Sequence, residues 1–476
     1  MVAAMVPQAL LDTLAARLGP KGFSRDPDLL APSLTDWRGR YRGQAAALLS
    51  PADTEGVATI VRACADARVA IVPQGGNTGM VGGATPSAEG GALLLSTRRM
   101  TAIRSLDADG GRLVAEAGVT LDAVHRAAAE HRLRFPLSLG ARGTATVGGL
   151  LSTNAGGTQV LRWGTMRALA AGLEAVLPDG AVLSTLAGLP KDNRGPDVAG
   201  LLIGAEGTLG VITAANLKLV AEPDARAVAW VGLGQANAAL ALLSALERHL
   251  PGAIESFELV PQGALDLVLR HLPGSRAPLS VAHRWHVLVE AVGDDSVAER
   301  LADALAAEAD GIEDATVAAN ETAAAALWSL REGIAEAERR EGRAAKHDIS
   351  VPVPAMPGFI EAIGAEVERR FPGTRVIAFG HLGDGNVHFN VLEPPGARAD
   401  WLDREAPVIT RLVHDRVLEA GGSISAEHGI GQMKRDEYRR TADPARLAAQ
   451  AAIKRALDPH GIMNPGKLLA DGDREP

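Results

Sequence analysis

The sequence contains a single cysteine and no long apolar run, and both absences exclude classes of protein. One cysteine, Cys64, cannot form an internal disulfide framework. It lies in the helical stretch TEGVATIVRACADARVA, where a buried and unreactive thiol is expected. No apolar run reaches the roughly eighteen residues of a membrane-spanning helix. The start, MVAAMVPQALLDTLAARLG, lacks the cleavage-site pattern of a secretory signal, so we expect a soluble, cytoplasmic protein.

The chain also lacks any concentration of basic residues. Lysine and arginine total 48 against 57 aspartates and glutamates, which is a formal net charge of -9, and the basic residues are scattered. A surface that binds nucleic acid needs a basic patch or stripe. We therefore expect a small molecule as the partner, and no nucleic acid.

The length of 476 residues exceeds what one hydrophobic core usually serves, so we expect two domains. From Ala45 to Gln74 the apolar pattern predicts strand, helix and strand, with Ser50 as the helix N-cap. Glycine clusters and turns follow and indicate further sheet. After Pro223 long helical patterns alternate with strand-like runs, which is typical of a separate α+β domain. We divide the chain into 1–222, 223–425 and 426–476.

Three glycine-rich segments share the first domain. The first, PQGGNTGMVGGATPS at 73–87, follows a predicted strand, and its backbone amides could all point at one anion such as a pyrophosphate. It lacks the Lys-Ser/Thr ending of a Walker loop, and no GxGxxG occurs in the chain, which disfavours a Rossmann site. Alone, this segment could equally be a surface loop. GARGTATVGGLLSTNAGG at 140–157 and GAEGTLGVIT at 204–213 change that, because three such segments predict a long groove suited to FAD.

These segments carry a resemblance to a known family. PQGGNTGMVGG, TATVGGLLSTNAGG and GAEGTLGVIT resemble the flavin-binding domain of the vanillyl-alcohol oxidase, or PCMH-type, superfamily. The closing LDPHGIMNPGK is similar to the C-terminal signature of its D-lactate and D-2-hydroxyglutarate dehydrogenase branch, and the match runs from about Asp36 to Lys467. The fold implied is α+β: a two-part PCMH-type FAD-binding domain, an α+β substrate domain with an antiparallel sheet and helices, and a C-terminal segment returning to the FAD domain.

The resemblance also implies how FAD is held. The first loop would bind the pyrophosphate, Gly140–Gly157 would line the ribityl chain and isoalloxazine, Glu206–Ile212 would flank the adenine-side half, and Asn464 would return to the flavin. The implied cofactor-binding residues are Pro73, Gln74, Gly75, Gly76, Asn77, Thr78, Gly79, Met80, Gly82, Gly83, Ser138, Gly140, Gly143, Thr144, Gly148, Gly149, Thr153, Asn154, Gly156, Gly157, Glu206, Gly207, Gly210, Ile212 and Asn464. No histidine or cysteine falls in these loops, so we expect non-covalent FAD.

A predicted hairpin, RVIAFGHLGDGNVHFNVLEP, suggests a metal site. Its Asp384-Gly385 pair predicts a two-residue turn, which would place His381 directly opposite His388. Period-two alternation adds Asn390 to the same face. Paired imidazoles suit zinc, iron or manganese, although two histidines that serve only the hairpin are the alternative.

The segment ISAEHGIGQMKR offers the missing ligand. Glu427 would complete a set of two histidines and one carboxylate that leaves coordination positions open. The resemblance assigns the metal to His381, His388 and Glu427, and it places Asn390 and His428 against the substrate. We expect zinc first, with manganese or iron as alternatives. His347, His414 and His460 are interpreted as structural or surface residues.

This set of residues fits the oxidation of an alcohol. A divalent cation can lower the pKa of bound water from about 15.7 to about 7 and should act similarly on a hydroxyl. His428 can accept the proton as the catalytic base, and FAD takes the hydride. The resemblance implies that Arg331 and Lys346 bind a distal carboxylate. Ala335 stands where the D-2-hydroxyglutarate branch usually has threonine, which keeps shorter acids open.

The prediction is an FAD-dependent, metal-assisted dehydrogenase of a D-2-hydroxy acid. D-2-hydroxyglutarate is the first candidate substrate, and D-lactate and D-malate are the alternatives. An electron-transfer flavoprotein or a quinone would accept the electrons, and a homodimer stays open. Two other classes are also kept: a metal-dependent hydrolase or lyase that binds a nucleotide, and a non-catalytic flavin-binding module.

Overall fold

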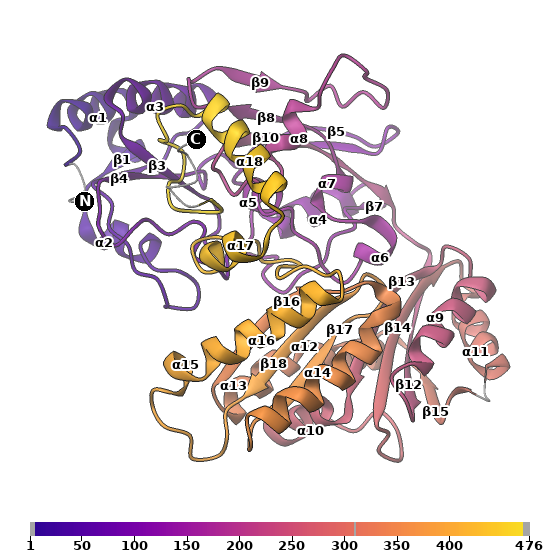
Figure 1. Ribbon diagram of the computed structural model, residues 1–476. Coiled ribbons are helices and arrows are strands. Elements are labelled where there is room, and N and C mark those ends of the chain that lie inside the picture. Colours follow the sequence, from indigo (N-terminus) through magenta and orange to yellow (C-terminus); the bar gives the residue numbers. More distant parts are fainter. Residues whose placement is uncertain (1–4, 309–310, 470–476) are drawn as a thin grey trace. The chain divides into compact units, whose positions relative to one another are not determined.

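The computed structural model describes residues 5–308 and 311–469, and the chain divides into two compact units (Figure 1). Taken over their described residues, Met1–Gly156, Gly164–Glu222 and Glu427–Pro476 form the first unit. Gly157–Trp163 and Pro223–Ala426 form the second. The short stretch Gly157–Trp163 was not expected in the second unit. Within the described ranges, every helix falls short of the length and apolarity that crossing a membrane requires.

One small sheet of the first unit is built on the expected strand, helix and strand. Its order is β1 (Phe23–Ser24), β2 (Leu48–Leu49), β4 (Ala92–Ser96) and β3 (Ala70–Gln74). The helix α3 (Thr54–Ala67) connects β2 to the parallel strands β3 and β4. Ser50 was the wrong N-cap, because the helix begins later and the Asp53 carboxylate accepts from the Gly56 amide. The chain end returns to this sheet, where Met463 forms a parallel bridge with Ile71.

The second sheet of the first unit is antiparallel and surrounds one buried strand. Its order is β5 (Ile103–Asp107), β6 (Arg112–Glu116), β10 (Val211–Lys218), β8 (Ala170–Val176) and β9 (Val182–Ser184). The central strand β10 is buried along almost its whole length. The helices that lie near the glycine-rich segments are short, namely α4 (Leu121–Ala129) and α5 (Val147–Ser152). The glycine-rich segments comprise the end of β3, the helix α5 and the start of β10, together with the loops beside them.

The second unit is one seven-stranded antiparallel sheet covered by helices. The strand order is β15 (Asp314–Val317), β12 (Ala225–Leu233), β14 (Trp285–Gly293), β13 (Ile254–Pro261), β17 (Arg375–His381), β18 (Asn386–Leu392) and β16 (Ala344–Ser350). The predicted runs HVLVEAV and VIAFGHL lie in β14 and β17. This is the expected α+β architecture with an antiparallel sheet.

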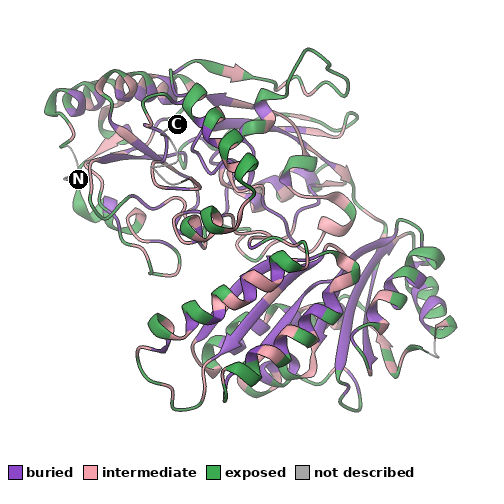
Figure 2. Ribbon diagram, viewed as in Figure 1, coloured by how far each residue is buried: buried purple, intermediate pink, exposed green. Residues whose placement is uncertain are grey.

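The two faces of this sheet carry separate cores. One core joins the sheet to α9 (Ala238–His249), α11 (Val297–Ala307), α14 (Met356–Arg370) and α16 (Ala406–Glu419). The other joins it to α10 (Gln262–His271), α12 (Glu321–Glu332) and α13 (Ile334–Glu341). Figure 2 shows the strands almost wholly buried between helices whose outer surfaces are exposed. Most polar residues on the second face are therefore buried, and this face holds two of the predicted ligands, His381 and His388.

Cys64 is fully buried on α3, as expected, and burial raises the pKa of its thiol to about 12. The thiolate is the reactive species, so almost none is available at about pH 8. We expect the native protein to resist a chromogenic disulfide reagent at this pH, whereas the denatured chain should release one equivalent of chromophore per chain. Rapid stoichiometric reaction of the native protein would contradict this buried placement.

Candidate functional site

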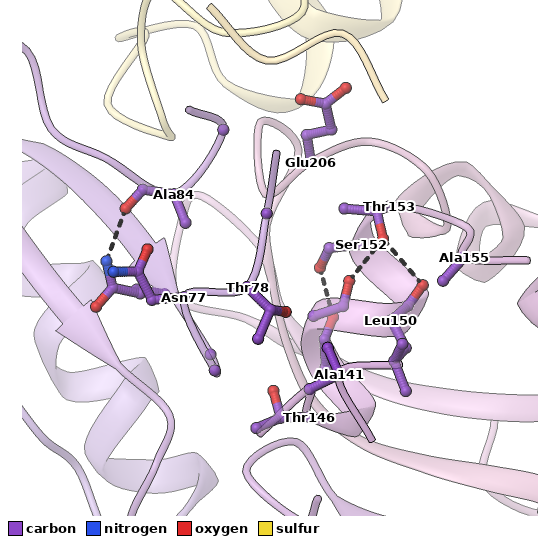
Figure 3. Close-up of a pocket in the computed structure, with 18 of the residues that line it drawn as sticks. Asn77, Thr78, Ala84, Ala141, Thr146, Leu150, Ser152, Thr153, Ala155 and Glu206 are labelled. Atoms are coloured by element: carbon purple, nitrogen blue, oxygen red, sulfur yellow. Dashed lines mark hydrogen bonds between the residues drawn. The ribbon is translucent and has the colours of Figure 1, made fainter. Parts of the chain in front are cut away.

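The first unit contains a cavity of about 750 Å³ whose wall is built mainly from the three glycine-rich segments. We call this cavity the groove, and Figure 3 shows it in close-up. Of the residues predicted to bind the cofactor, twenty line the groove: Pro73, Gln74, Gly75, Gly76, Asn77, Thr78, Gly79, Met80, Gly83, Gly140, Gly143, Thr144, Gly148, Gly149, Thr153, Gly156, Glu206, Gly207, Gly210 and Ile212. The three segments thus meet on one cavity, as their composition predicted.

Five predicted residues lie outside the described wall of the groove: Gly82, Ser138, Asn154, Gly157 and Asn464. Gly157 belongs to the second unit. Asn464 supports the wall from behind, because its amide donates to the carbonyls of Gly83 and Glu206 at 2.9 and 2.7 Å. The C-terminal signature therefore connects two of the three segments.

The Arg98 guanidinium binds the first segment from the side opposite to two of its backbone amides. Arg98 donates to the carbonyls of Gly75 and Gly76 at 3.2 and 3.0 Å. In a trans peptide the N–H points opposite to the carbonyl, so the amides of Gly76 and Asn77 point away from this guanidinium. Asn77 has a positive φ of 55° and donates to the Thr35 carbonyl. Sequence reasoning missed Arg98, since nothing near it suggested a ligand.

The close approach of the segments explains the glycines. A Cβ on Gly76 would lie 2.0 Å from the Thr144 carbonyl oxygen, and one on Gly75 would lie 2.3 Å from the Thr146 hydroxyl. Thr146 lines the groove, and its hydroxyl is buried with no hydrogen-bond partner in the described structure. A buried polar atom needs such a partner. A polar cofactor in the groove would supply one.

Glu206 holds a second loop at the groove. Its carboxylate oxygens accept from the amides of Ile430 and Gly431, both at 2.7 Å. Burial raises the pKa of Glu206, and these two amide bonds oppose that rise. The loop so attached carries Glu427 and His428, which both line the groove. Glu206 therefore fixes the position of this loop as well as lining the groove. Its place in the sequence GAEGTLG gave no sign of the first role.

In the second unit, the hairpin between β17 and β18 differs from the predicted one. His381 pairs with Asn386 and Phe379 pairs with His388, so four residues rather than two connect the strands. The predicted direct opposition of His381 and His388 is wrong. The register differs by two residues, however, and a shift of two keeps every side chain on its face. The two imidazoles are diagonal neighbours with ring centroids 5.5 Å apart.

The same pairing collects polar residues on one face of the sheet. Lys346 lies opposite Asn390, Asp348 opposite His388, and Glu258 opposite His381. We call Glu258, Lys346, Asp348, His381, His388 and Asn390 the polar face. It is the face toward α12 and α13, because the alternate residues of these strands pack into the other core. The shared face of His381, His388 and Asn390 is thereby confirmed.

A fully buried carboxylate organises the polar face. Glu258 accepts from His381 Nδ1 at 2.5 Å and from Arg331 Nε at 2.7 Å. Burial raises the pKa of Glu258, but the charges of Arg331 and His381 and their hydrogen bonds outweigh it and lower that pKa to about 2. The Arg331 guanidinium also lies 4.6 Å from the ring centroid of Phe379. Glu258 was not predicted, although a glutamate inside the apolar strand IESFELV was a usable signal.

The hydrogen bond to Glu258 has a consequence for His381. Because Nδ1 donates to the carboxylate, metal coordination by this imidazole would use Nε2. A carboxylate behind a ligating histidine is the usual arrangement in metal sites, where it orients the ring and raises its basicity. The second unit thus supplies two neighbouring imidazoles, one of them oriented in the manner of a ligand.

A second buried carboxylate holds the other predicted anchors. Glu338 is fully buried and lies 2.8 Å from Lys346 Nζ, and both of its oxygens accept from Asn390 Nδ2 at 2.9 Å. Lys346 and Asn390 therefore meet at Glu338, whereas Arg331 meets Glu258. Sequence reasoning missed Glu338, because it stands in AEAERREG among solvated charges and nothing marks it as buried.

The three histidines that were interpreted as structural or surface residues lie where they were expected. His347 is buried, with Nδ1 2.6 Å from the Phe389 carbonyl and Nε2 3.0 Å from the Thr410 hydroxyl. His414 is buried with its ring centroid 5.7 Å from that of His347, whereas His460 is exposed. All three are structural or surface residues.

Replacing Glu258 should destabilise the second unit. Glu258→Gln leaves the buried Arg331 without its counter-charge, and breaking such a pair costs about 3 kcal/mol or more. The midpoint of thermal denaturation should therefore fall clearly. The matched control is Glu361→Gln, which removes a half-exposed partner of Arg284 and should leave the midpoint nearly unchanged. Equal midpoints for the two variants would contradict the importance of Glu258.

Comparisons with known proteins agree with this architecture. Residues 45–186 match the family described as FAD binding domain, and residues 222–468 match FAD linked oxidases, C-terminal domain. The chain is 35% identical over 460 residues to the mitochondrial D-2-hydroxyglutarate dehydrogenase of Arabidopsis thaliana, covering 95% of this chain and 80% of that protein. It is 37% identical over 444 residues to D-2-hydroxyglutarate dehydrogenase of Xanthomonas citri pv. viticola, covering 92% of each. A putative mitochondrial D-lactate dehydrogenase of Schizosaccharomyces pombe is 35% identical over 460 residues, covering 94% of this chain and 86% of that protein.

Solved structures show the fold. The chain resembles p-cresol methylhydroxylase with a TM-score of 0.70 and 17% identity, covering 97% of this chain and 96% of that one. Alkyldihydroxyacetonephosphate synthase gives a TM-score of 0.73 and 16% identity, covering 98% and 86%. The expected PCMH-type fold is confirmed. The chain belongs to the FAD linked oxidase family and is an FAD-dependent oxidoreductase.

Proposed function

We propose that this oxidoreductase converts a D-2-hydroxy acid to the 2-oxo acid, with a divalent cation held by His381, His388 and Glu427. The observation that carries the proposal is the pair of neighbouring imidazoles, of which His381 is oriented through Nδ1 by a buried carboxylate. A hydrolase, a lyase or a non-catalytic flavin module does not fit an FAD-dependent oxidoreductase, so those alternatives are set aside.

The position of Glu427 in the chain, directly after Ala426, supports it as the third ligand. Within the second unit, the Ala426 amide donates to the Asp348 carbonyl at 3.4 Å, and Asp348 pairs with His388 in the sheet. Glu427 is the next residue, and within the first unit it lines the groove. Two imidazoles and a carboxylate suit zinc first, and manganese or iron as alternatives. A divalent cation at this site would lower the pKa of a hydroxyl.

The groove supports FAD as the bound cofactor. The amides of the first segment and the Thr146 hydroxyl offer donors to a polar ligand. The glycines leave the backbone of that segment accessible to the ligand. We propose that the flavin is bound without a covalent link. Bound FAD supplies the hydride acceptor. His428 lines the same groove and is the proposed base that receives the hydroxyl proton near neutral pH.

Two features bear on the substrate. Relatives at 35–38% identity are named D-2-hydroxyglutarate dehydrogenases, which makes D-2-hydroxyglutarate the first candidate by similarity. D-lactate and D-malate are the alternatives, because Ala335 offers no hydroxyl donor for a distal carboxylate and one relative carries a D-lactate name. The D configuration rests on these names. We propose an electron-transfer flavoprotein or a quinone as the acceptor.

Flavin reduction without oxygen tests the activity directly. We expect the D enantiomer of lactate, malate or 2-hydroxyglutarate to bleach the visible flavin absorbance, and the L enantiomer to leave it unchanged. Loss of the bleaching after treatment with a chelator would support the metal. Bleaching by L enantiomers, or by none of the six acids, would contradict the proposed function.

Variants of two ligands test the metal site. His388→Ala and Glu427→Ala each remove a ligand, so metal content should fall well below one ion per chain and turnover should drop roughly a hundredfold or more. Flavin absorbance should stay, because neither change removes a glycine-rich segment. His460→Ala, on an exposed histidine, is the control. Full metal content in either ligand variant would refute the assigned site.

A further inference from the structure

A buried carboxylate lies beside Lys346, one of the two cations that the family resemblance implies for a distal substrate carboxylate. Glu338 on α13 is fully buried, and it lies 2.8 Å from Lys346 Nζ. Both of its oxygens also accept from Asn390 Nδ2 at 2.9 Å. Lys346 and Asn390 are paired across β16 and β18, so one carboxylate holds both of these residues. Lys346 and Asn390 are thereby engaged by the protein itself.

Arg331 is engaged in the same way. Its Nε donates to Glu258 Oε2 at 2.7 Å, and Glu258 is fully buried. The positive charges of Arg331 and Lys346 are thus matched by the negative charges of Glu258 and Glu338. Asp348, also buried and paired with His388, adds a further acidic residue to the polar face. Apart from the imidazoles and any bound metal, three acidic and two basic side chains therefore sum to a net charge of -1.

A second substrate carboxylate would be unfavourable in this setting. It would have to displace Glu338 or Glu258 from its cation and leave that carboxylate buried without a partner, which is strongly unfavourable. If nothing moved, it would approach a buried carboxylate of the same charge, and like charges across an interface disfavour binding. Ala335, one turn from Arg331 and at the start of α13, adds no hydroxyl that could compensate.

We propose that Glu338 is a specificity-determining residue that excludes a second carboxylate from the substrate. The preferred substrate is then a 2-hydroxy monocarboxylic acid whose side chain is uncharged. This inference rests on the proposed function and refines it, because it favours acids of the lactate type over D-malate and D-2-hydroxyglutarate. A site that carries a built-in negative charge selects against anionic side chains by repulsion rather than by shape.

The sharpest test compares two substrates that differ only in charge. D-2-hydroxyglutarate and its distal carboxamide have nearly the same size, so the ratio of their kcat/KM values reports the effect of the second carboxylate. In the metal-loaded, flavin-loaded enzyme we expect the carboxamide to be preferred by roughly tenfold or more. D-lactate should likewise be preferred over D-malate. A preference for either dicarboxylate would overturn the inference.

Glu338→Gln assigns the effect to one side chain. Glutamine keeps the size of the side chain and a hydrogen-bond acceptor but removes the negative charge. The positive charge of Lys346 then has no compensating carboxylate at this position. The ratio of kcat/KM values should shift toward D-2-hydroxyglutarate by roughly tenfold or more, mainly through the KM of the dicarboxylate. The matched control is Glu336→Gln on the same helix, an exposed residue that pairs with Arg340 and should leave the ratio unchanged. An unchanged ratio in Glu338→Gln would refute the assignment.

The outcomes separate this inference from the proposed function. If no D-2-hydroxy acid of either charge reduces the flavin, the proposed function fails and the inference falls with it. If a dicarboxylate is preferred and the Glu338→Gln ratio equals that of the wild type, only the inference fails. Should Glu338→Gln not fold, the ratio of carboxamide to carboxylate in the wild-type enzyme still decides, because it requires no variant.

Discussion

The arrangement of the second unit depends on the burial of the Glu258 carboxylate. A carboxylate without solvent must be neutralised and hydrogen-bonded, and here Arg331 and His381 meet both requirements. The two contacts set the position of a guanidinium and the orientation of an imidazole on two different elements, α12 and β17. The predicted anchor and the predicted ligand are therefore not independent features of the surface. One buried charge holds both.

Two other glutamates show the same arrangement of a buried carboxylate that binds donors from separate segments. Glu338 joins Lys346 to Asn390 in the second unit, and Glu206 attaches the loop of Glu427 and His428 to the groove in the first. In each case a buried carboxylate satisfies donors from segments far apart in the sequence. Such contacts suit a site that must hold polar groups rigidly, because removing either partner leaves the other buried and unsatisfied.

The parts of the site that could be predicted are those with a local physical cause. Dense glycine signals close backbone approach wherever it occurs, so three such segments predicted the groove. Period-two alternation placed His381, His388 and Asn390 on one face even though the turn was wrong, because the true register differs by an even number of residues. Ser50 failed as a cap because the helix begins later, where the Asp53 carboxylate accepts from the Gly56 amide.

The amino-acid sequence was enough to predict the two-unit α+β architecture, the groove-forming segments and the chemical types of the proposed ligands, since all of these follow from composition and short-range pattern. Which charges meet, by contrast, is set by the packing of the folded chain. Glu258 gains its role from partners 73 and 123 residues away in the sequence, and Glu338 from partners 8 and 52 residues away. The partners of Arg98 lie 23 and 22 residues away. Nothing in the neighbourhood of a glutamate states whether it will be buried. That depends on the packing of distant strands and helices, and this packing pairs Arg331 with Glu258 and Lys346 with Glu338.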